Sequence, residues 1–210
     1  KFKPVWLTNY EMISDAEYVE FIKDVERRNA GELGMHLHAW NTPPDYELSI
    51  VQNGQPYLIE YPERIIDSKI EFLTNYIEQK TGIRPTTHRA GRWAINSLYL
   101  GILKKYGYTV DCSVTPHIDW TSSPGRSEGA KGCDYTRESE DTSLLNTPYG
   151  KILEVPMTVR KTHAYIPSKV GSMKGNAWAL WKMICGRTIW MRPTKFNENE
   201  VGLLLRKEAN

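Results

Sequence analysis

The chain has 210 residues, enough for one sizeable hydrophobic core, and we expect a single domain over residues 1–210. Its 27 lysines and arginines nearly balance 25 aspartates and glutamates, and the formal charge of +2 gives no electrostatic reason to expect nucleic acid or an anionic membrane as a partner. Hydrophobic residues make up 40% of the chain, but no run of them approaches the roughly 18 apolar residues of a membrane span. Composition therefore predicts a soluble globular protein without a transmembrane segment.

Two features bear on the cellular compartment. The three cysteines, Cys112, Cys133 and Cys185, are too scattered for a disulfide framework or a zinc knuckle, so we expect free thiols. No apolar stretch of a secretory signal follows the basic residues at the start of the sequence. We therefore expect a cytoplasmic protein, with the periplasm as the alternative if a leader has been removed.

Segments with strand character alternate with segments of helical periodicity. Short runs of strand formers predict strands at 5–8, 33–39, 85–88, 109–113, 152–156 and 188–191. Apolar residues at helical spacing predict helices at 14–30, 62–81, 96–106, 177–184 and 198–207, the first opening with a capping box at Ser14 and Glu17. The polar stretch 115–149 is predicted to be an insertion loop. Trp178 and Trp181, three apart in a predicted helix, are expected in the core or on a packing face.

This alternation determines the expected fold class. Strands that alternate with helices favour an α/β protein with a parallel sheet, and the sequence lacks a glycine-rich dinucleotide fingerprint. A strand–helix barrel therefore fits better than a doubly wound sheet. Reacting groups in such barrels lie at the carboxyl ends of strands and on the loops that follow, so unusual residues at those positions are the candidates for chemistry.

The first candidate site is a pair of histidines in the second predicted strand. Residues two apart on a strand point to the same side, so His36 and His38 could share one metal ion through their imidazole nitrogens. The alternative is two hydrogen-bonded histidines on a strand edge. Trp40, which follows them, could provide a stacking face for a sugar, or could be a packing residue.

Two further groups of polar and aromatic residues follow predicted strands. Arg89, Arg92 and Trp93 come after the third strand, where a guanidinium could hold a carboxylate in a fixed geometry, although arginines around a glycine often contribute only surface charge. Asp111, at the end of the fourth strand, could assist catalysis or cap a turn. The loop beyond it adds polar and aromatic side chains, namely His117, Asp119 and Trp120.

The order and spacing of these motifs carry a resemblance to a known family. The stretch 33–40 followed by Pro43-Pro44, then 89–93, then 107–116, resembles the polysaccharide deacetylase superfamily, especially members associated with bacterial surface-polysaccharide, O-antigen and lipopolysaccharide synthesis. The likeness spans roughly residues 5–193. It implies a distorted barrel of parallel strands and a hydrolase that removes N-acetyl or similar groups from amino sugars of a polysaccharide or its precursor with a divalent metal, zinc in the first place.

The resemblance also implies roles for individual residues. His36 matches the first histidine ligand, and Arg89 matches the arginine that orients a catalytic aspartate. The loop with Asp119 and Trp120 looks like the acid–aromatic element of the substrate groove, and we expect Trp40, Arg92, Trp93 and His117 to line it as well. The usual second histidine lies four residues after the first, where this chain has Trp40, so His38 takes that role by analogy.

Other parts of the family pattern are not found in the sequence. The opening aspartate motif and the closing histidine motif are expected outside residues 1–210, and with them the first and last strands of the barrel and the general base and acid. Two alternatives therefore stay open. One is a carbohydrate-binding relative without catalysis, and the other is a barrel metallohydrolase of amidohydrolase type, which would need further ligands near His88, His117 or His163.

Overall fold

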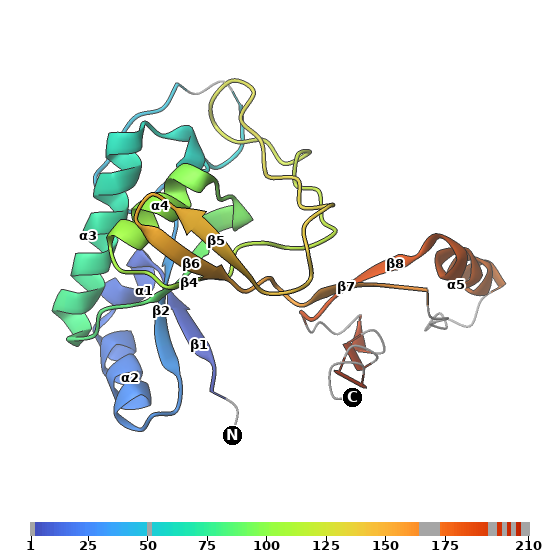
Figure 1. Cartoon of the computed structure of the whole chain (residues 1–210), viewed down its shortest axis with the longest axis horizontal. Helices are drawn as coiled ribbons and strands as arrows, with labels where there is room; N and C mark the ends of the chain where they lie inside the picture. The colour runs from blue at the N-terminus through green and yellow to red at the C-terminus, as the bar shows by residue number, and fades with distance from the viewer. Residues whose placement is uncertain are drawn as a thin grey trace.

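The computed structural model describes residues 3–49, 52–163, 173–192, 197, 198, 201, 202, 205 and 206 (Figure 1). The strands are β1 (Val5–Thr8), β2 (Glu32–Leu37), β3 (Thr87–Ala90), β4 (Val110–Asp111), β5 (Ser143–Thr147), β6 (Gly150–Glu154), β7 (Val159–Thr162) and β8 (Arg187–Trp190). The α-helices are α1 (Tyr10–Ser14), α2 (Ala16–Arg27), α3 (Glu63–Thr81), α4 (Ser97–Lys105) and α5 (Met173–Cys185), and short 3-10 turns span Leu58–Glu60 and Gly91–Trp93. In this part of the chain no helix is long and apolar enough to cross a membrane.

A six-stranded, mostly parallel sheet forms the centre of the fold. Its strand order is β1-β2-β3-β4-β6-β5, with parallel pairing throughout except for the antiparallel hairpin of β5 and β6. The predicted α/β class and parallel sheet are confirmed. The register pairs His36 with Arg89, His88 with Asp111, and Asp111 with Glu154. These polar residues therefore occupy neighbouring positions near the carboxyl ends of β2, β3, β4 and β6.

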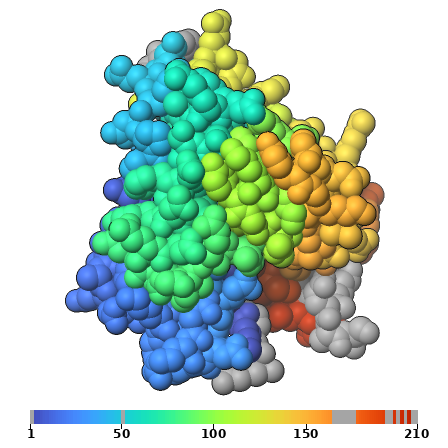
Figure 2. Space-filling view, turned by 60° about the vertical axis from the view of Figure 1, so that its left-hand side comes forward, coloured from blue at the N-terminus to red at the C-terminus, as the bar shows by residue number. Residues whose placement is uncertain are grey.

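The helices cover the sheet through one continuous core. The apolar stripe of α3, including Ile66, Ile70, Leu73 and Ile77, is buried against β2 and its neighbours. Figure 1 shows α2 and α3 along the same side of the sheet, and Figure 2 shows the β5–β6 hairpin beside α4. Burying these side chains at about 1.5–3 kcal/mol each stabilises the layer that fixes the strand ends.

Local sequence explains where the helices begin and end. Asn96 accepts a hydrogen bond from the backbone N–H of Tyr99 and caps α4, while Gly82, in the left-handed conformation at φ 77°, ends α3. The first predicted helix is in fact two, because Asp15, not Ser14, caps α2 by accepting from Tyr18 N at 2.8 Å.

Three expectations differ from the structure. The predicted loop 115–149 is wrong at its end, since 143–147 form β5, joined to β6 through a tight turn at Gly150, whose φ is 116°. The described residues form an open sheet in which β5 occupies the outer edge of β6, and the expected barrel, whose first and last strands are expected outside residues 1–210, is not seen in them. The predicted strand at 188–191 is β8, but it pairs with β7 in a separate ribbon. The predicted helix 198–207 lies partly outside the described residues.

Candidate functional site

The histidine pair is the centre of the candidate site. His36 lies near the end of β2, and His38 follows directly after the strand. Their ring centroids are 4.6 Å apart at an interplanar angle of 76°, so both imidazoles lie on the same side of the strand, as their spacing predicts. Trp40 stacks on the other side of His38, with centroids 4.4 Å apart and rings inclined by only 17°. The sequence motif is therefore a continuous row of three rings.

Neighbouring elements hold the two imidazoles differently. His36 Nδ1 lies 2.9 Å from the carbonyl oxygen of Arg89 on the adjacent strand, and burial lowers the pKa of His36 to about 4. At neutral pH this ring is uncharged, so Nδ1 carries the proton and Nε2 keeps a lone pair. His38 Nδ1 lies 3.4 Å from a carboxylate oxygen of Glu11, which belongs to α1 just beyond the end of β1.

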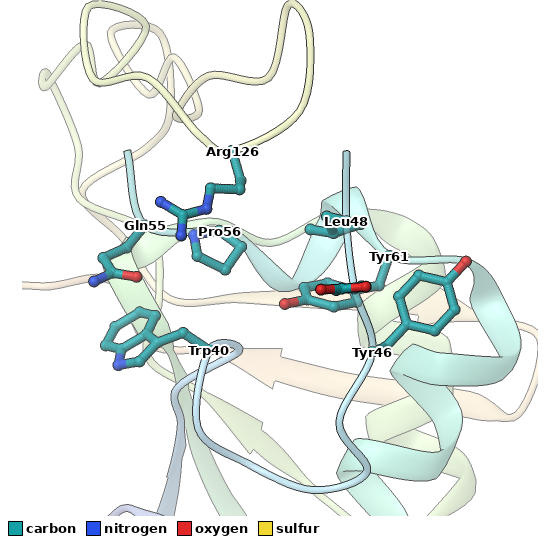
Figure 3. Close-up of a pocket in the computed structure, with 8 residues that line it drawn as sticks. Trp40, Tyr46, Leu48, Gln55, Pro56, Tyr61 and Arg126 are labelled. Atoms are coloured by element: carbon teal, nitrogen blue, oxygen red, sulfur yellow. The ribbon is translucent and has the colours of Figure 1, made fainter. Parts of the chain in front are cut away.

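A pocket of about 290 Å³ opens beside Trp40. It is lined by Trp40, Tyr46, Glu47, Leu48, Gln55, Pro56, Tyr61 and Arg126. Figure 3 shows Arg126 entering from one side over Gln55 and Pro56, with Trp40 across from it and the rings of Tyr46 and Tyr61 together at the other end. Flat apolar rings combined with an amide, a carboxylate and a guanidinium suit a small ring-shaped ligand with hydroxyl groups.

Two charged side chains hold the loops that form this pocket. The carboxylate of Glu60 accepts from the backbone N–H groups of Arg126 and Ser127, and so joins the segment after β2 to the loop that follows β4. Lys69, on α3, is almost fully buried and donates to the carbonyl oxygens of Thr42 and Pro44, which fixes the chain just before the pocket. Burial lowers the pKa of Lys69 to about 8.

Arg89 reaches the same edge of the sheet from β3. Its Nε donates to the carbonyl oxygen of Cys112 at 3.1 Å, and its guanidinium carbon lies 5.1 Å from the centroid of the Trp93 ring. Trp190 of β8 contacts the rings of both Trp93 and Trp120, at centroid distances of 5.3 and 6.2 Å. The tryptophan rings of Trp93, Trp120 and Trp190 therefore form a contiguous aromatic cluster between Arg89 and the ribbon of β7 and β8.

Asp111 lies behind the site in a fully buried network. One of its carboxylate oxygens is 2.6 Å from His88 Nδ1 and accepts from Ser113 Oγ, while His88 Nε2 is 2.8 Å from the Tyr99 hydroxyl. Burial raises the pKa of Asp111, but hydrogen bonds, first from His88, outweigh it and leave the pKa below its ordinary value. Since Asp111 and His88 are both 0% exposed, neither can touch a ligand at the surface.

Glu154 completes this network from β6. It is paired with Asp111 in the sheet register, and one carboxyl oxygen accepts from Val114 N at 3.0 Å. Burial, and then the nearby Asp111 carboxylate, raise the pKa of Glu154 to about 10, so it is protonated at neutral pH. A buried neutral carboxyl group beside a buried carboxylate avoids placing two negative charges in the core.

The remaining predicted residues act within the loops. Both terminal nitrogens of Arg92 donate to backbone carbonyls, of Gln55 and of Pro124, and its guanidinium lies 3.9 Å from the Tyr57 ring. His117 Nε2 is 2.6 Å from a carboxylate oxygen of Glu140, and Asp119 caps its own turn. The structure therefore brings His36, His38, Trp40, Arg89 and Trp93 toward one edge, and it places the other candidates in supporting roles or apart.

The histidine pair fits only part of a metal site. Two imidazoles with the backbone-bonded geometry of His36 are typical of metal ligands. Within the described ranges, however, no cluster of three or more His, Cys, Asp or Glu side chains could hold a metal ion. The further histidines of an amidohydrolase-type centre are also committed elsewhere, since His88 is buried and His163 lies 3.0 Å from the Met183 carbonyl oxygen.

Sequence reasoning missed several residues around the site. Glu11 could have been found, because it is an acid a few residues beyond the first predicted strand. Glu154 could also have been found, because it is the one charged residue in the predicted strand 152–156. Tyr46, Tyr61 and Arg126 gave no signal, because the fold brings them together from three separate segments.

Comparison with known proteins finds matches among solved structures alone. No family model matches the chain, and no curated protein matches it. Among solved structures, one titled "putative polysaccharide deacetylase" from Mycobacterium smegmatis aligns over 86% of this chain at 15% sequence identity and a TM-score of 0.46. The alignment covers 52% of that protein, so this chain spans about half its length. At this identity and TM-score we draw nothing about chemistry from the likeness.

Proposed function

We propose that this chain binds a carbohydrate at the carboxyl edge of its sheet and acts as a deacetylase that hydrolyses N-acetyl or similar acyl groups of amino sugars. One observation carries the proposal. The ring centroids of His36 and His38 lie 4.6 Å apart, and His38 stacks against Trp40, which lines a pocket of aromatic and polar side chains. The motif resemblance in the sequence supports the choice of amide hydrolysis and of a surface polysaccharide or its precursor as substrate.

A divalent metal, zinc first, would be held by His36 and His38, and the described residues supply no third side-chain ligand. When bound, such an ion would supply a water of lowered pKa and polarise the acyl oxygen. The hydrogen bond from His36 Nδ1 to the Arg89 carbonyl fixes the ring and leaves Nε2 as the lone-pair nitrogen. His36 is neutral at neutral pH, which keeps that nitrogen available.

The other residues orient and bind. Arg89 is fixed through its Nε and by the Trp93 ring, and we assign it the role of holding a carboxylate or an acyl oxygen. Asp111 is buried, and we assign it to positioning, because it fixes Ser113 and thereby the backbone of β3 through the bond from Ala90 N to Ser113 Oγ. Trp40 provides the stacking face for the sugar ring.

A second function, carbohydrate binding without catalysis, is favoured by the incomplete ligand set. Both functions predict that the pocket binds a sugar, but only the deacetylase predicts that acetate is released. Acetate release from N-acetylglucosamine oligosaccharides, measured together with sugar binding by calorimetry, separates them.

We expect the native chain to release acetate and His38→Ala to lose release while it keeps sugar binding. Trp40→Ala should weaken sugar binding by about tenfold, because a stacked aromatic face is lost. Leu144→Ser, at an exposed position on the edge strand β5, serves as the matched surface control and should change neither quantity. Binding without acetate release in the native chain would contradict catalysis and leave the binding function, whereas neither binding nor release would contradict both.

A further inference from the structure

The near-neutral total charge conceals a strongly basic segment. Between residues 155 and 197 the sequence contains eight lysines and arginines and no aspartate or glutamate. The rest of the chain therefore carries 19 basic and 25 acidic residues, a formal charge of −6. Such an asymmetry between parts of one chain is typical of a protein that meets a polyanion or an anionic surface with one end. The overall charge of +2 gave no indication of it.

The same segment exposes an apolar helix face. Trp178, Trp181 and Ile184 succeed one another at a spacing of three residues on α5, and they are 53%, 54% and 74% exposed. Leu180 beside them is 50% exposed, while Ala179 is buried. We expected the two tryptophans in the core or on a packing face, but the helix turns them outward. An outward face of tryptophan, leucine and isoleucine is unusual for a surface helix in water.

Two cationic side chains contact these rings: Lys182, which is partly exposed, and Arg187, which is only 8% exposed. The Lys182 ammonium is 5.6 Å from the Trp178 ring and 5.1 Å from the Trp181 ring, and the Arg187 guanidinium is 4.9 Å from the Trp178 ring. Arg192 is exposed two residues after β8. Indoles flanked by lysine and arginine are the combination found where a protein lies in the interface of a bilayer, with rings among the headgroups and cations on phosphates.

The position of α5 gives the face access to a large flat surface. β7 and β8 form an antiparallel ribbon, and α5 lies between them in sequence. Figure 1 shows α5 at the end of this ribbon that is farthest from the six-stranded sheet. The base of the ribbon is tied to the body, since Trp190 contacts Trp93 and Trp120. The helix can therefore meet a surface without covering the candidate site.

We propose that the α5 face binds an anionic phospholipid surface and anchors the protein peripherally to a membrane. The charge of the segment favours anionic headgroups, and the exposed Leu180 and Ile184 beside the tryptophans favour a lipid interface over a nucleic acid, whose bases stack on aromatic rings but gain nothing from aliphatic side chains. This proposal is independent of the deacetylase chemistry, because it rests on residues remote from His36 and His38.

The test is co-sedimentation of the 210-residue chain with vesicles of phosphatidylcholine, with or without phosphatidylglycerol. We expect binding to the anionic vesicles, weakening with added salt, and a blue shift of tryptophan emission on binding. A Trp178→Ser/Trp181→Ser variant should lower the vesicle partition coefficient by about tenfold or more, because the inserted rings are lost. Lys182→Gln, which removes one positive charge, should lower it by about fivefold on anionic vesicles alone. Leu144→Ser, exposed elsewhere on β5, is the matched control and should bind like the native chain.

Three results would overturn the proposal. Equal sedimentation with and without phosphatidylglycerol would remove the anionic surface as the partner. Absence of vesicle binding together with a concentration-dependent dimer that Trp181→Ser abolishes would assign the face to a second copy of the chain. Binding to a DNA oligonucleotide that is stronger than vesicle binding and unchanged in the tryptophan variant would assign the segment to nucleic acid. Circular dichroism of each variant shows whether it is folded.

Discussion

Replacing Glu154 by glutamine should make the protein more stable, and increasingly so as the pH rises. Glu154 is protonated in the folded state, where its pKa is about 10, but ionises in the unfolded chain near its ordinary pKa of 4.5. Between these values the unfolded state binds fewer protons than the native state, so the stability contributed by Glu154 is complete below about pH 4.5 and is lost as the pH rises toward 10. The loss amounts to at most about 1.4 kcal/mol per pH unit.

Glutamine removes this dependence and keeps the contacts. Its amide oxygen can accept from Val114 N, and its NH₂ group takes the place of Glu154 Oε2, a buried atom without a hydrogen-bond partner near Asp111. The stability difference between Glu154→Gln and native protein should therefore grow by up to about 2.7 kcal/mol between pH 7 and pH 9. Taking the difference cancels the titration of other groups, such as His36 and Lys69, which is common to both proteins.

Urea unfolding of the two proteins at pH 7, 8 and 9 measures this difference. Glu71→Gln, on the exposed side of α3, is the matched control and should show no comparable trend. A stability difference for Glu154→Gln that is the same at pH 7 and pH 9 would refute the reasoning, because it would mean that Glu154 is already ionised beside Asp111 in the native state.

Two other substitutions test the buried polar groups. His88→Ala should destabilise the fold by about 3–5 kcal/mol in urea unfolding, because it leaves the carboxylate of Asp111 buried without its histidine partner. His117→Ala, which breaks a partly exposed pair with Glu140, should cost less than about 1 kcal/mol. Equal losses of stability in the two variants would contradict the account. The stability of Lys69→Met should fall further below that of the native protein as the pH rises above 8. Burial lowers the pKa of Lys69 to about 8, so between pH 8 and its ordinary pKa of 10.5 the unfolded chain binds a proton that the folded chain does not, and the native protein gains stability. A stability difference that stays constant from pH 7 to pH 10 would contradict that ionisation.

Helices with a strong periodic stripe and clear end signals could be predicted from the sequence. The structure confirms α3 between Glu63 and Gly82 and α4 after the Asn96 cap, because each boundary depends on a local hydrogen bond or backbone conformation. The start of α2 was misplaced by one residue. Ser14 and Asp15 are both residue types that commonly cap helices. Ser14 is the last residue of α1, where its hydroxyl donates to the carbonyl oxygen of Tyr10.

Features that depend on contacts across the sheet could not be predicted in the same way. β5 is short, exposed and polar in part, so it becomes a strand only because β6 offers it an edge to pair with. The histidine row was predictable from its spacing of two, whereas the pocket beside it was not, because Tyr61 and Arg126 lie far apart in sequence. The apolar stripe of α5 was identified, but periodicity cannot say whether a stripe faces the core or the solvent.

The measurement that most directly tests the pairing of His36 and His38 as the reaction centre is zinc affinity, obtained by competition with a chromophoric chelator. We predict that the native chain binds one zinc ion and that His36→Ala and His38→Ala each weaken binding by about tenfold to a hundredfold or more, since each removes a ligand and its fixed orientation. His163→Ala, at an exposed histidine outside the site, should bind as the native chain does. Equal affinity in all four proteins, or no zinc binding in any, would contradict the assignment of the histidine pair as a metal-holding centre.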